Sequence, residues 1–453
     1  MSLELPEFEA FVQEKMSETS LPGVSVAIVK QGRVAYSRGF GLRDVAARLP
    51  ATPETLYGIG SITKSFTALA ISQLVDDGRL DFHDPVGKYF PVGLASFKRV
   101  TLHHLLTHSS GMPALGYAEA YISRLTGIDN EVPAPPSTPE GIASFMADSD
   151  DWREAEPGER FFYLNEGYAL LGAVISRVTG MPYAEFVRER ILEPLSMKET
   201  FFAQRDVDAK SDRATPYIIH EGKPTATSFP YGLTADGGLV SNVLDLSKYL
   251  TMYLGRGTFE GNRVVSLRSL QEMEKARIGV PHPLVDHEEY GYGLRITPDF
   301  FGQRLVHHGG SVYVHTGFLG YLPEAETGIA ILANASGYSP SDLGAHALAA
   351  LMGRDPSSLP FVRSANLMKG VEGHYLTYGG TKRAQISREG DFLRMHFSDG
   401  FPAESIVLMP DRLDEHLATF HTFIGSRRYD AEFRVYKRPV ELVFERYKFR
   451  RSE

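Results

Sequence analysis

Residues 65–78, SFTALAISQLVDDG, constrain the fold more than any other part of the sequence. Placed on a helix, this stretch is apolar or small on nearly every side until its last residues. A helix that is apolar all round is stable in water only when other elements surround it, and Gly78 is suited to ending it. We therefore expect a central buried helix with the other elements packed around it.

The sequence has β character on both sides of a helical middle. In residues 24–44, two β-rich runs flank a short turn in which Gly32 provides the necessary conformation, which predicts a hairpin. The β signal returns over residues 290–335, where residues 328–336 have the pattern of a buried strand. Residues 167–180 form the clearest amphipathic helix between these regions.

The composition changes after Arg354. The segment DPSSLP, with two prolines and two serines, is typical of a linker. The following residues contain short runs in which aromatic and charged residues alternate, as on half-exposed antiparallel strands: KRAQIS, FLRMHF, SIVLMP, ATFHTFI, YDAEFRVYK and VELVFERYKFRR. We predict an N-terminal domain over residues 1–354, a linker over residues 355–362 and a small β-barrel over residues 363–453.

Charge and composition exclude several classes of function. A net charge of −9 and a pI near 6.0 disfavour nucleic acid as a partner. The chain has no cysteine, which excludes disulfides, cysteine nucleophiles and thiolate metal sites. It shows neither a secretory leader nor an uninterrupted apolar run of about 18 residues. The sequence therefore predicts a cytoplasmic protein with no membrane partner.

The segment YGIGSITKSF carries the first candidate for chemistry. Ser61 and Lys64 are three residues apart, so on a first helical turn their side chains share one face, with Cβ atoms about 5–6 Å apart. A serine hydroxyl needs a base to act as a nucleophile, and a lysine can serve if burial lowers its pKa. Alternatively, Lys64 stays charged and lowers the pKa of a neighbouring tyrosine. Ser-x-x-Lys is a weak motif, but this pair is the only one in the chain.

Two further motifs follow in order. Tyr163 and Asn165 form the only Tyr-x-Asn, placed just before the amphipathic helix, where a tyrosine can exchange protons and an amide can bind a substrate. His-x-Gly occurs in four frames, which begin at His220, His307, His308 and His315.

A metal site is the other interpretation of the histidines. His104 and His108 have the i, i+4 spacing of zinc-binding helices, but the glutamate that accompanies such pairs is missing. We therefore expect no metal and no cofactor.

Taken in order, Ser-x-x-Lys, Tyr-x-Asn and His-x-Gly resemble the motifs of the serine β-lactamase and penicillin-binding-protein-like hydrolases, especially the class C β-lactamase and esterase branch. The resemblance spans roughly residues 7–350 and includes LPGVSVAIVKQGRV, TLHHLLTHSSGMP, ADGGLVS and YLPEAETGIAILAN. It implies an α/β (α+β) fold, in which helices and an all-helical subdomain surround an antiparallel sheet. The C-terminal module would be a lipocalin-like antiparallel β-barrel.

The resemblance also implies residue roles. Ser61 would be the acylated nucleophile, Lys64 and Tyr163 its proton-shuttling pair, and Asn165 the contact to the substrate amide. His308 is the histidine at the family's distance from Leu322-Pro323-Glu324, so it would face the acyl-enzyme in place of the family's strand lysine. The remaining expected substrate-binding residues are Gly309, Gly310 and Ser311, with the N–H groups of Ser61 and Ser311 as oxyanion donors.

After Val312 the chain departs from the family, because Tyr313, Val314 and His315 replace its usual Pro-Gly-Phe. The role of His315 stays open at this point.

Histidine at position 308 also bears on the substrate. A lysine offers a permanent cation for a carboxylate, whereas a histidine is mostly neutral at pH 7. We therefore predict a serine peptidase that cleaves amide bonds of small peptides rather than β-lactams, and the family resemblance implies that these peptides contain D-amino acids. A carboxylesterase on small acyl esters is the alternative, followed by a β-lactamase or a silent binding protein.

The expected barrel makes the chain similar to an archaeal group of self-compartmentalising peptidases that form closed octamers. This predicts a homo-oligomer, while a simple dimerisation or lid domain is the alternative.

Overall fold

The computed structural model describes residues 3–90, 99–129, 131, 138–147, 149–398 and 404–452. The chain forms two compact units, residues 1–354 and residues 355–453. Across the described ranges, no helix has both the length and the apolar character needed to cross a membrane.

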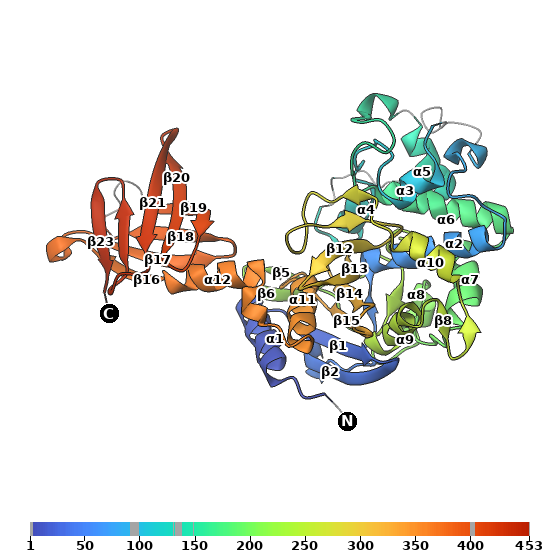
Figure 1. Ribbon diagram of the computed structural model, residues 1–453, viewed down its shortest axis with the longest axis horizontal. Coiled ribbons are helices and arrows are strands. Elements are labelled where there is room, and N and C mark those ends of the chain that lie inside the picture. The colour runs from blue at the N-terminus through green and yellow to red at the C-terminus, as the bar shows by residue number, and fades with distance from the viewer. Residues whose placement is uncertain are drawn as a thin grey trace. The chain divides into compact units, whose positions relative to one another are not determined.

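The first unit is organised by an antiparallel sheet, which within the described residues has nine strands (Figure 1). In spatial order these are β10 (Ile278–Gly279), β11 (Glu289–Tyr290), β12 (Arg295–Phe300), β13 (Gln303–Ser311), β14 (Thr316–Leu322), β15 (Thr327–Ala333), β1 (Gly23–Lys30), β2 (Arg33–Asp44) and β3 (Leu49–Pro50). The expected hairpin is confirmed as β1 and β2, and β1 also pairs with the distant β15, with Val26 opposite Ile331.

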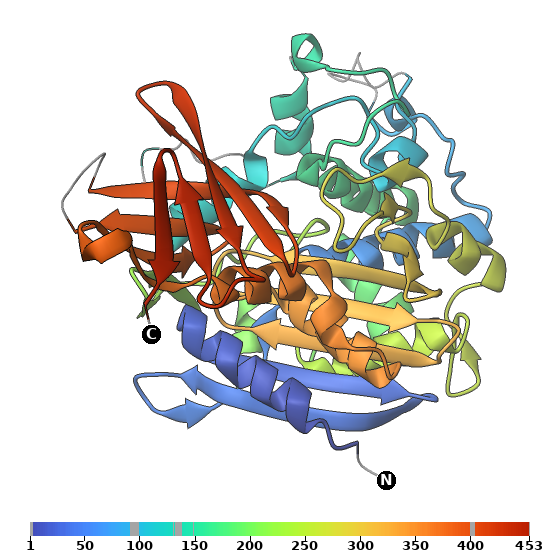
Figure 2. The ribbon, with the colours of Figure 1, turned by 60° about the vertical axis from the view of Figure 1, so that its left-hand side comes forward.

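Helices cover both faces of this sheet. Phe318 and Tyr321 of β14 point to opposite faces by strand alternation. On one face, Phe318 packs closely on Gly344 of α11 (Pro340–Leu351), which lies beside α1 (Pro6–Thr19) (Figure 2). On the other face, Tyr321 stacks on Tyr253 of α9 (Val243–Leu254) with ring centroids 5.0 Å apart.

The buried helix expected from the sequence is α2 (Thr63–Asp76), which lies on the α9 side. Leu69 and Ile71 have no exposed surface, and Phe66 stacks on Tyr249 at 3.9 Å. The helix begins two residues earlier than the periodicity indicates, because a 3-10 turn, η1 (Gly60–Ile62), leads directly into it.

A helical region packs beyond α2 and contains α3 (Leu102–Leu106), α4 (Tyr117–Thr126), α5 (Pro139–Met146) and α6 (Asn165–Thr179). The amphipathic helix predicted from the sequence is α6. Other α-helices among the described residues of this unit are α7 (Tyr183–Val187), α8 (Gln204–Asp208) and α10 (Leu267–Met273). Short strand pairs are β4 (Tyr57–Gly58) with β7 (Val240–Ser241), β5 (Tyr217–His220) with β6 (Lys223–Ala226), and β8 (Thr258–Phe259) with β9 (Asn262–Arg263).

The second unit is a closed antiparallel barrel, as expected. Its strands are β16 (Gly373–Leu376), β17 (Arg383–Glu389), β18 (Phe392–Phe397), β19 (Ser405–Leu413), β20 (Leu417–Ile424), β21 (Arg427–Arg434), β22 (Glu441–Phe444) and β23 (Tyr447–Arg451). The interpretation of VELVFERYKFRR as one strand is wrong, because the chain turns at Glu445, with φ +53°, and pairs back as β23.

The predicted linker over residues 355–362 has helical structure. It forms a 3-10 turn, η6 (Pro356–Ser358), and the first turn of α12 (Pro360–Gly370). Asp355 caps η6 by accepting from the Ser357 N–H at 2.9 Å. Proline is favoured at the first position of a helix because its φ is already helical, so the prolines read as linker residues start helical turns.

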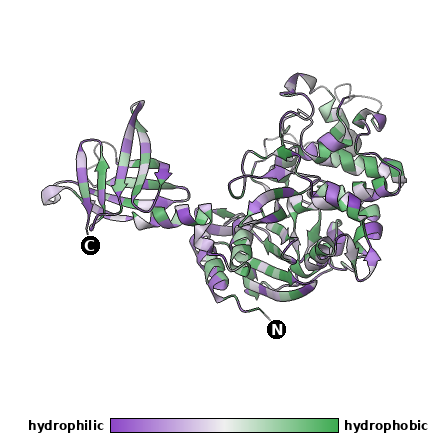
Figure 3. Ribbon diagram, viewed as in Figure 1, coloured by the Kyte–Doolittle hydropathy of each residue, from purple (hydrophilic) through white to green (hydrophobic). Residues whose placement is uncertain are grey.

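The barrel interior is filled by side chains. Polar and apolar residues alternate along the strands (Figure 3), and the inward positions carry large apolar groups. Phe420, Phe433, Phe444 and Phe449 are at most 1% exposed. This barrel is thus a packed core of its own.

Candidate active site

Ser61 lies in η1, between the short strand β4 and helix α2. Gly60, immediately before it, has φ +53°, a conformation that L-residues other than glycine adopt only with strain. A Cβ at Gly60 would also lie 2.6 Å from the Ser311 nitrogen. The turn that carries Ser61 is therefore in direct backbone contact with the end of β13.

Lys64 is completely buried and directs its Nζ at three oxygens. The Nζ lies 3.1 Å from Ser61 Oγ, 2.7 Å from Asn165 Oδ1 and 2.6 Å from the carbonyl oxygen of Asp236. The Asn165 and Asp236 oxygens can only accept from Lys64, whereas Ser61 Oγ can accept from the ammonium or donate to the neutral amine. The expected proximity of Ser61, Lys64 and Asn165 is what the structure shows.

Tyr163 completes the group. Its ring centroid lies 4.8 Å from Lys64 Nζ, and its ring packs on His108 at 4.1 Å. The Tyr163 hydroxyl has no hydrogen-bond partner among the described residues, and Tyr163 lines the same cavity as Ser61. Tyr163 thus borders both Lys64 and the cavity over Ser61, and its role in proton transfer stays a prediction.

Strand β13 forms one wall of the site. A Cβ at Gly310 would lie 1.9 Å from the Ile59 carbonyl oxygen, so only glycine fits there. A Cβ at Gly309 would lie 3.2 Å from Ser341 Oγ on α11. The close approach at Gly310 lets Ser311 reach the turn that carries Ser61, as the oxyanion-hole expectation requires.

His308 lies behind this wall. Its Nδ1 is 2.5 Å from the Gly309 carbonyl oxygen and must donate to it, so Nε2 accepts from the Tyr290 hydroxyl at 2.8 Å. Burial, together with the positive charge of Arg295, holds the pKa of His308 well below its usual value. The imidazole is therefore neutral with both nitrogens bonded to protein, and its contact with an acyl group stays a prediction.

His307 points to the other face of β13, which confirms the expected alternation. Its Nε2 lies 3.4 Å from Glu288 Oε2. Burial alone would raise the pKa of Glu288, but His307 and Arg295 outweigh it and lower that pKa to about 2.

His104 and His108 do not converge. The Nδ1 of His108 accepts from the Leu164 N–H at 2.9 Å, and that of His104 from the Thr101 N–H at 3.1 Å. Among the described residues, no group of three possible metal ligands comes together.

A cavity of about 200 Å³ opens over Ser61, and its charge is acidic. Glu119 and Asp236 are the only charged side chains among the described residues that line it. Burial raises the pKa of Asp236, an effect that Lys64 partly opposes. Glu119 Oε1 accepts from Asn165 Nδ2 at 3.3 Å. Sequence reasoning missed Glu119, because no motif marks it on α4, and noted Asp236 only within the family-like segment ADGGLVS, which a plain turn explains equally well.

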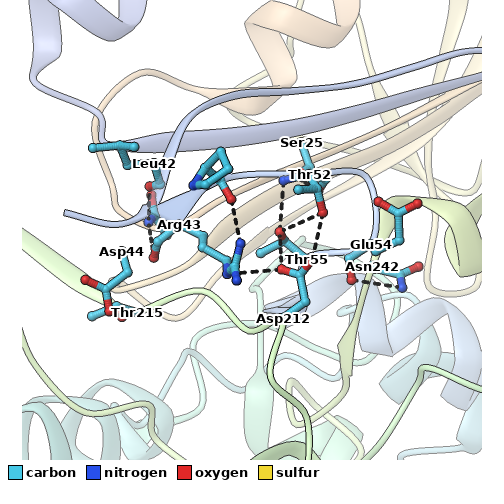
Figure 4. A network of polar contacts seen from close by, with 12 residues as sticks. Ser25, Leu42, Arg43, Asp44, Thr52, Glu54, Thr55, Asp212, Thr215 and Asn242 are labelled. Carbon is cyan, nitrogen blue, oxygen red and sulfur yellow. Dashed lines mark hydrogen bonds and ion pairs between the residues drawn. The ribbon is translucent and has the colours of Figure 1, made fainter. Parts of the chain in front are cut away.

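The chain that enters β4 is fixed by a polar network around Asp212 (Figure 4). The Asp212 carboxylate accepts from the hydroxyls of Thr52 and Thr55 at 2.8 and 2.6 Å. Arg43 Nε on β2 lies 3.2 Å from it, and the Asp212 carbonyl accepts from the Leu56 N–H at 2.9 Å. The segment before Ser61 is thus anchored to the sheet.

A family model described as beta-lactamase matches residues 8–353, which include every residue of this site. The chain belongs to the β-lactamase family. It is a family of β-lactamase-fold serine hydrolases that includes D-amino acid amidases. A second model, described as the Pab87 octamerisation domain, matches residues 356–450.

Solved structures of this family resemble the chain over most of its length. The octameric penicillin-binding protein homologue from Pyrococcus abyssi is 46% identical, with a TM-score of 0.91, covering 99% of this chain and 100% of that one. A D-stereospecific amidohydrolase from Streptomyces sp. is 25% identical, with a TM-score of 0.60 over 73% of this chain and 96% of that one. D-amino acid amidase from Ochrobactrum anthropi SV3, at 24% identity and a TM-score of 0.62, covers 77% of this chain and 99% of its own, and shares the fold.

Among curated relatives, Protein flp of Staphylococcus aureus (strain MW2) is 28% identical over 334 residues. The match covers 72% of this chain and 62% of that protein.

Proposed function

We propose that this protein is a serine peptidase that cleaves small peptides or amino-acid amides through an acyl-enzyme on Ser61. The observation that carries the proposal is the 3.1 Å contact between Ser61 Oγ and the buried Lys64 Nζ. A serine hydroxyl becomes an effective nucleophile when a proton acceptor lies within hydrogen-bond reach. Tyr163, beside Lys64, is the second group that can take or return that proton.

The reaction would run in two acyl transfers. Ser61 Oγ attacks the amide carbon while its proton passes to Lys64 or Tyr163, and the carbonyl oxygen becomes an oxyanion held by the N–H groups of Ser61 and Ser311. The C–N bond breaks as the amine takes that proton. Water then attacks the ester by the same route and releases Ser61.

The charge of the cavity favours a substrate with a free amino group. A carboxylate next to Ser61 would meet Glu119 and Asp236, while Lys64 is already bonded to three oxygens. An α-ammonium group would instead be attracted by the same carboxylates. The two acidic side chains of the cavity therefore favour aminopeptidase or amino-acid amidase chemistry over β-lactam hydrolysis.

Glu119 provides a test of this preference. We expect kcat/KM for a D-amino-acid p-nitroanilide with a free amine to exceed that of its N-acetyl derivative by about tenfold or more, since one ion pair of 1.4 kcal/mol corresponds to a factor of ten. Glu119→Gln should remove most of that ratio, whereas Glu7→Gln, on the exposed side of α1, should leave it unchanged. An unaltered ratio in Glu119→Gln would contradict the ammonium assignment.

A panel of D- and L-amino-acid amides and p-nitrophenyl esters tests the chemistry itself. The names of the D-amino acid amidase and the D-stereospecific amidohydrolase support a preference for D-substrates. We therefore expect D-amides to be cleaved faster than L-amides. Turnover of esters with no cleavage of any amide would identify a carboxylesterase instead.

We further propose that the chain assembles as a homo-oligomer, an octamer, through its second unit. The match to an octamerisation domain and the octameric state of the Pyrococcus abyssi homologue support this. A chain that ends at Arg354 should therefore have a much smaller assembly mass by light scattering than the full chain. Equal subunit numbers in both would remove the second unit from assembly.

A further inference from the structure

His315 connects the two segments that carry the expected oxyanion donors. It follows the tight turn after β13, and its carbonyl oxygen accepts from the Val312 N–H at 3.0 Å. Its side chain reaches across to the chain before Ser61, where Nδ1 accepts from the Gly58 N–H at 2.8 Å. One residue thus bonds to the neighbour of Ser311 and to the strand that leads into Ser61.

These bonds act where the two segments already touch. Gly60 and Gly310 allow backbone contact between the turn of Ser61 and the end of β13. Such steric contact keeps the two segments from moving closer but does not hold them together. On its other side, the entering chain pairs with β7 and is held just before that strand by the bond from Ile59 N–H to the Leu239 carbonyl at 2.9 Å. Among the described residues, the His315 side chain provides the hydrogen bond that holds Gly58 toward β14.

The protonation state of His315 suits this role. A backbone N–H can only donate, so Nδ1 must be the acceptor and Nε2 carries the ring proton. Burial lowers the pKa of His315 to about 3, which the Ala214 carbonyl only partly opposes. The acceptor on Nδ1 is therefore present throughout the neutral range.

We propose that His315 is a positioning residue that sets the distance between the Ser61 and Ser311 N–H groups, and thereby the geometry of the oxyanion hole. This inference rests on the proposed acyl transfer at Ser61. An oxyanion donor acts mainly on the transition state, where it contributes about 10²–10³-fold to kcat. Loss of the His315 bond should consequently lower kcat and leave KM nearly unchanged.

Two substitutions separate positioning from packing. His315 packs against the rings of Tyr57 and Phe229, at centroid distances of 5.8 and 5.4 Å. His315→Phe keeps an aromatic ring in that space but has no acceptor. His315→Asn places its Oδ1 near the position of Nδ1 and loses the ring. If His315 positions the site, His315→Phe should lower kcat and the rate of fluorophosphonate labelling by about tenfold or more, and His315→Asn should recover most of that loss while unfolding at a lower temperature.

The outcomes are distinct. If kcat and the labelling rate decrease in the same order as the unfolding temperature, His315→Asn will be slower than His315→Phe. That result would show that His315 only packs the core and would overturn the inference. Hydrogen exchange at the Gly58 amide gives a readout independent of activity, because only His315→Phe should lose its protection. Unchanged protection in His315→Phe also overturns the inference. A wild-type protein that forms no adduct, with the expected exchange pattern intact, would refute the proposed function and leave the Gly58 bond established.

Discussion

Replacing Ser61 by alanine should abolish turnover and covalent labelling. When the nucleophile of a serine hydrolase is removed and water must attack directly, kcat falls by about 10⁴–10⁶-fold. Ser61 Oγ contacts Lys64 Nζ at 3.1 Å and lines the cavity, so its removal deletes the only atom that the mechanism acylates. The measurement is the intact mass after incubation with a fluorophosphonate, together with kcat on an amino-acid amide.

Ser72→Ala is the matched control for Ser61→Ala. Ser72 lies on the same helix, is fully buried, and its hydroxyl donates to the Ala68 carbonyl at 2.8 Å. Such a bond within a helix contributes little, so Ser72→Ala should form the adduct at the wild-type rate. An adduct of equal yield in Ser61→Ala would place the nucleophile elsewhere.

Lys64→Ala should lower kcat by about 10²–10⁴-fold, which is the range attributed to proton transfer by a positioned side chain. The substitution removes the group that contacts Ser61 Oγ and leaves Asn165 Oδ1 and the Asp236 carbonyl without their partner. Each unsatisfied buried acceptor costs about 1–3 kcal/mol. The unfolding temperature must therefore be measured beside the rate, at a temperature where the variant is folded.

Lys248→Ala is the control for loss of a lysine. Lys248 lies on α9, and its Nζ bonds to Asp245 at 2.6 Å without reaching the cavity. It should lose some stability and keep its kcat. A Lys64→Ala protein with near-normal turnover would leave Tyr163 as the proton acceptor and remove Lys64 from the mechanism.

The parts of the site that could be predicted are those fixed by local spacing. Ser61 and Lys64 lie one helical turn apart, so the helix alone brings them together. The position of His307 followed from strand alternation, and the hairpin of β1 and β2 from its turn residues. Asn165 was placed by a motif rather than by spacing, and Lys64 Nζ meets it at 2.7 Å although the two residues are far apart in sequence.

The parts that could not be predicted depend on contacts between distant segments. Glu119 enters the cavity because α4 packs near α6, and nothing in the sequence around it indicates this. The second hydrogen bond of His308 comes from Tyr290, which no motif connects with it. The hairpin of β22 and β23 was missed because Glu445 takes a left-handed conformation that glycine or asparagine would have signalled.

Closure of the barrel limits how its surface can be recognised. In a closed barrel each strand has a neighbour on both sides, so the described strands include no edge strand of the kind that recruits a strand from another chain. A partner of this unit would therefore contact side chains on the outside of the barrel or in its loops. Phe423, 64% exposed, and Met409, 49% exposed, are large apolar groups in such positions. Recognition by this unit can therefore change through single surface substitutions, while the strand pairing that folds it stays the same.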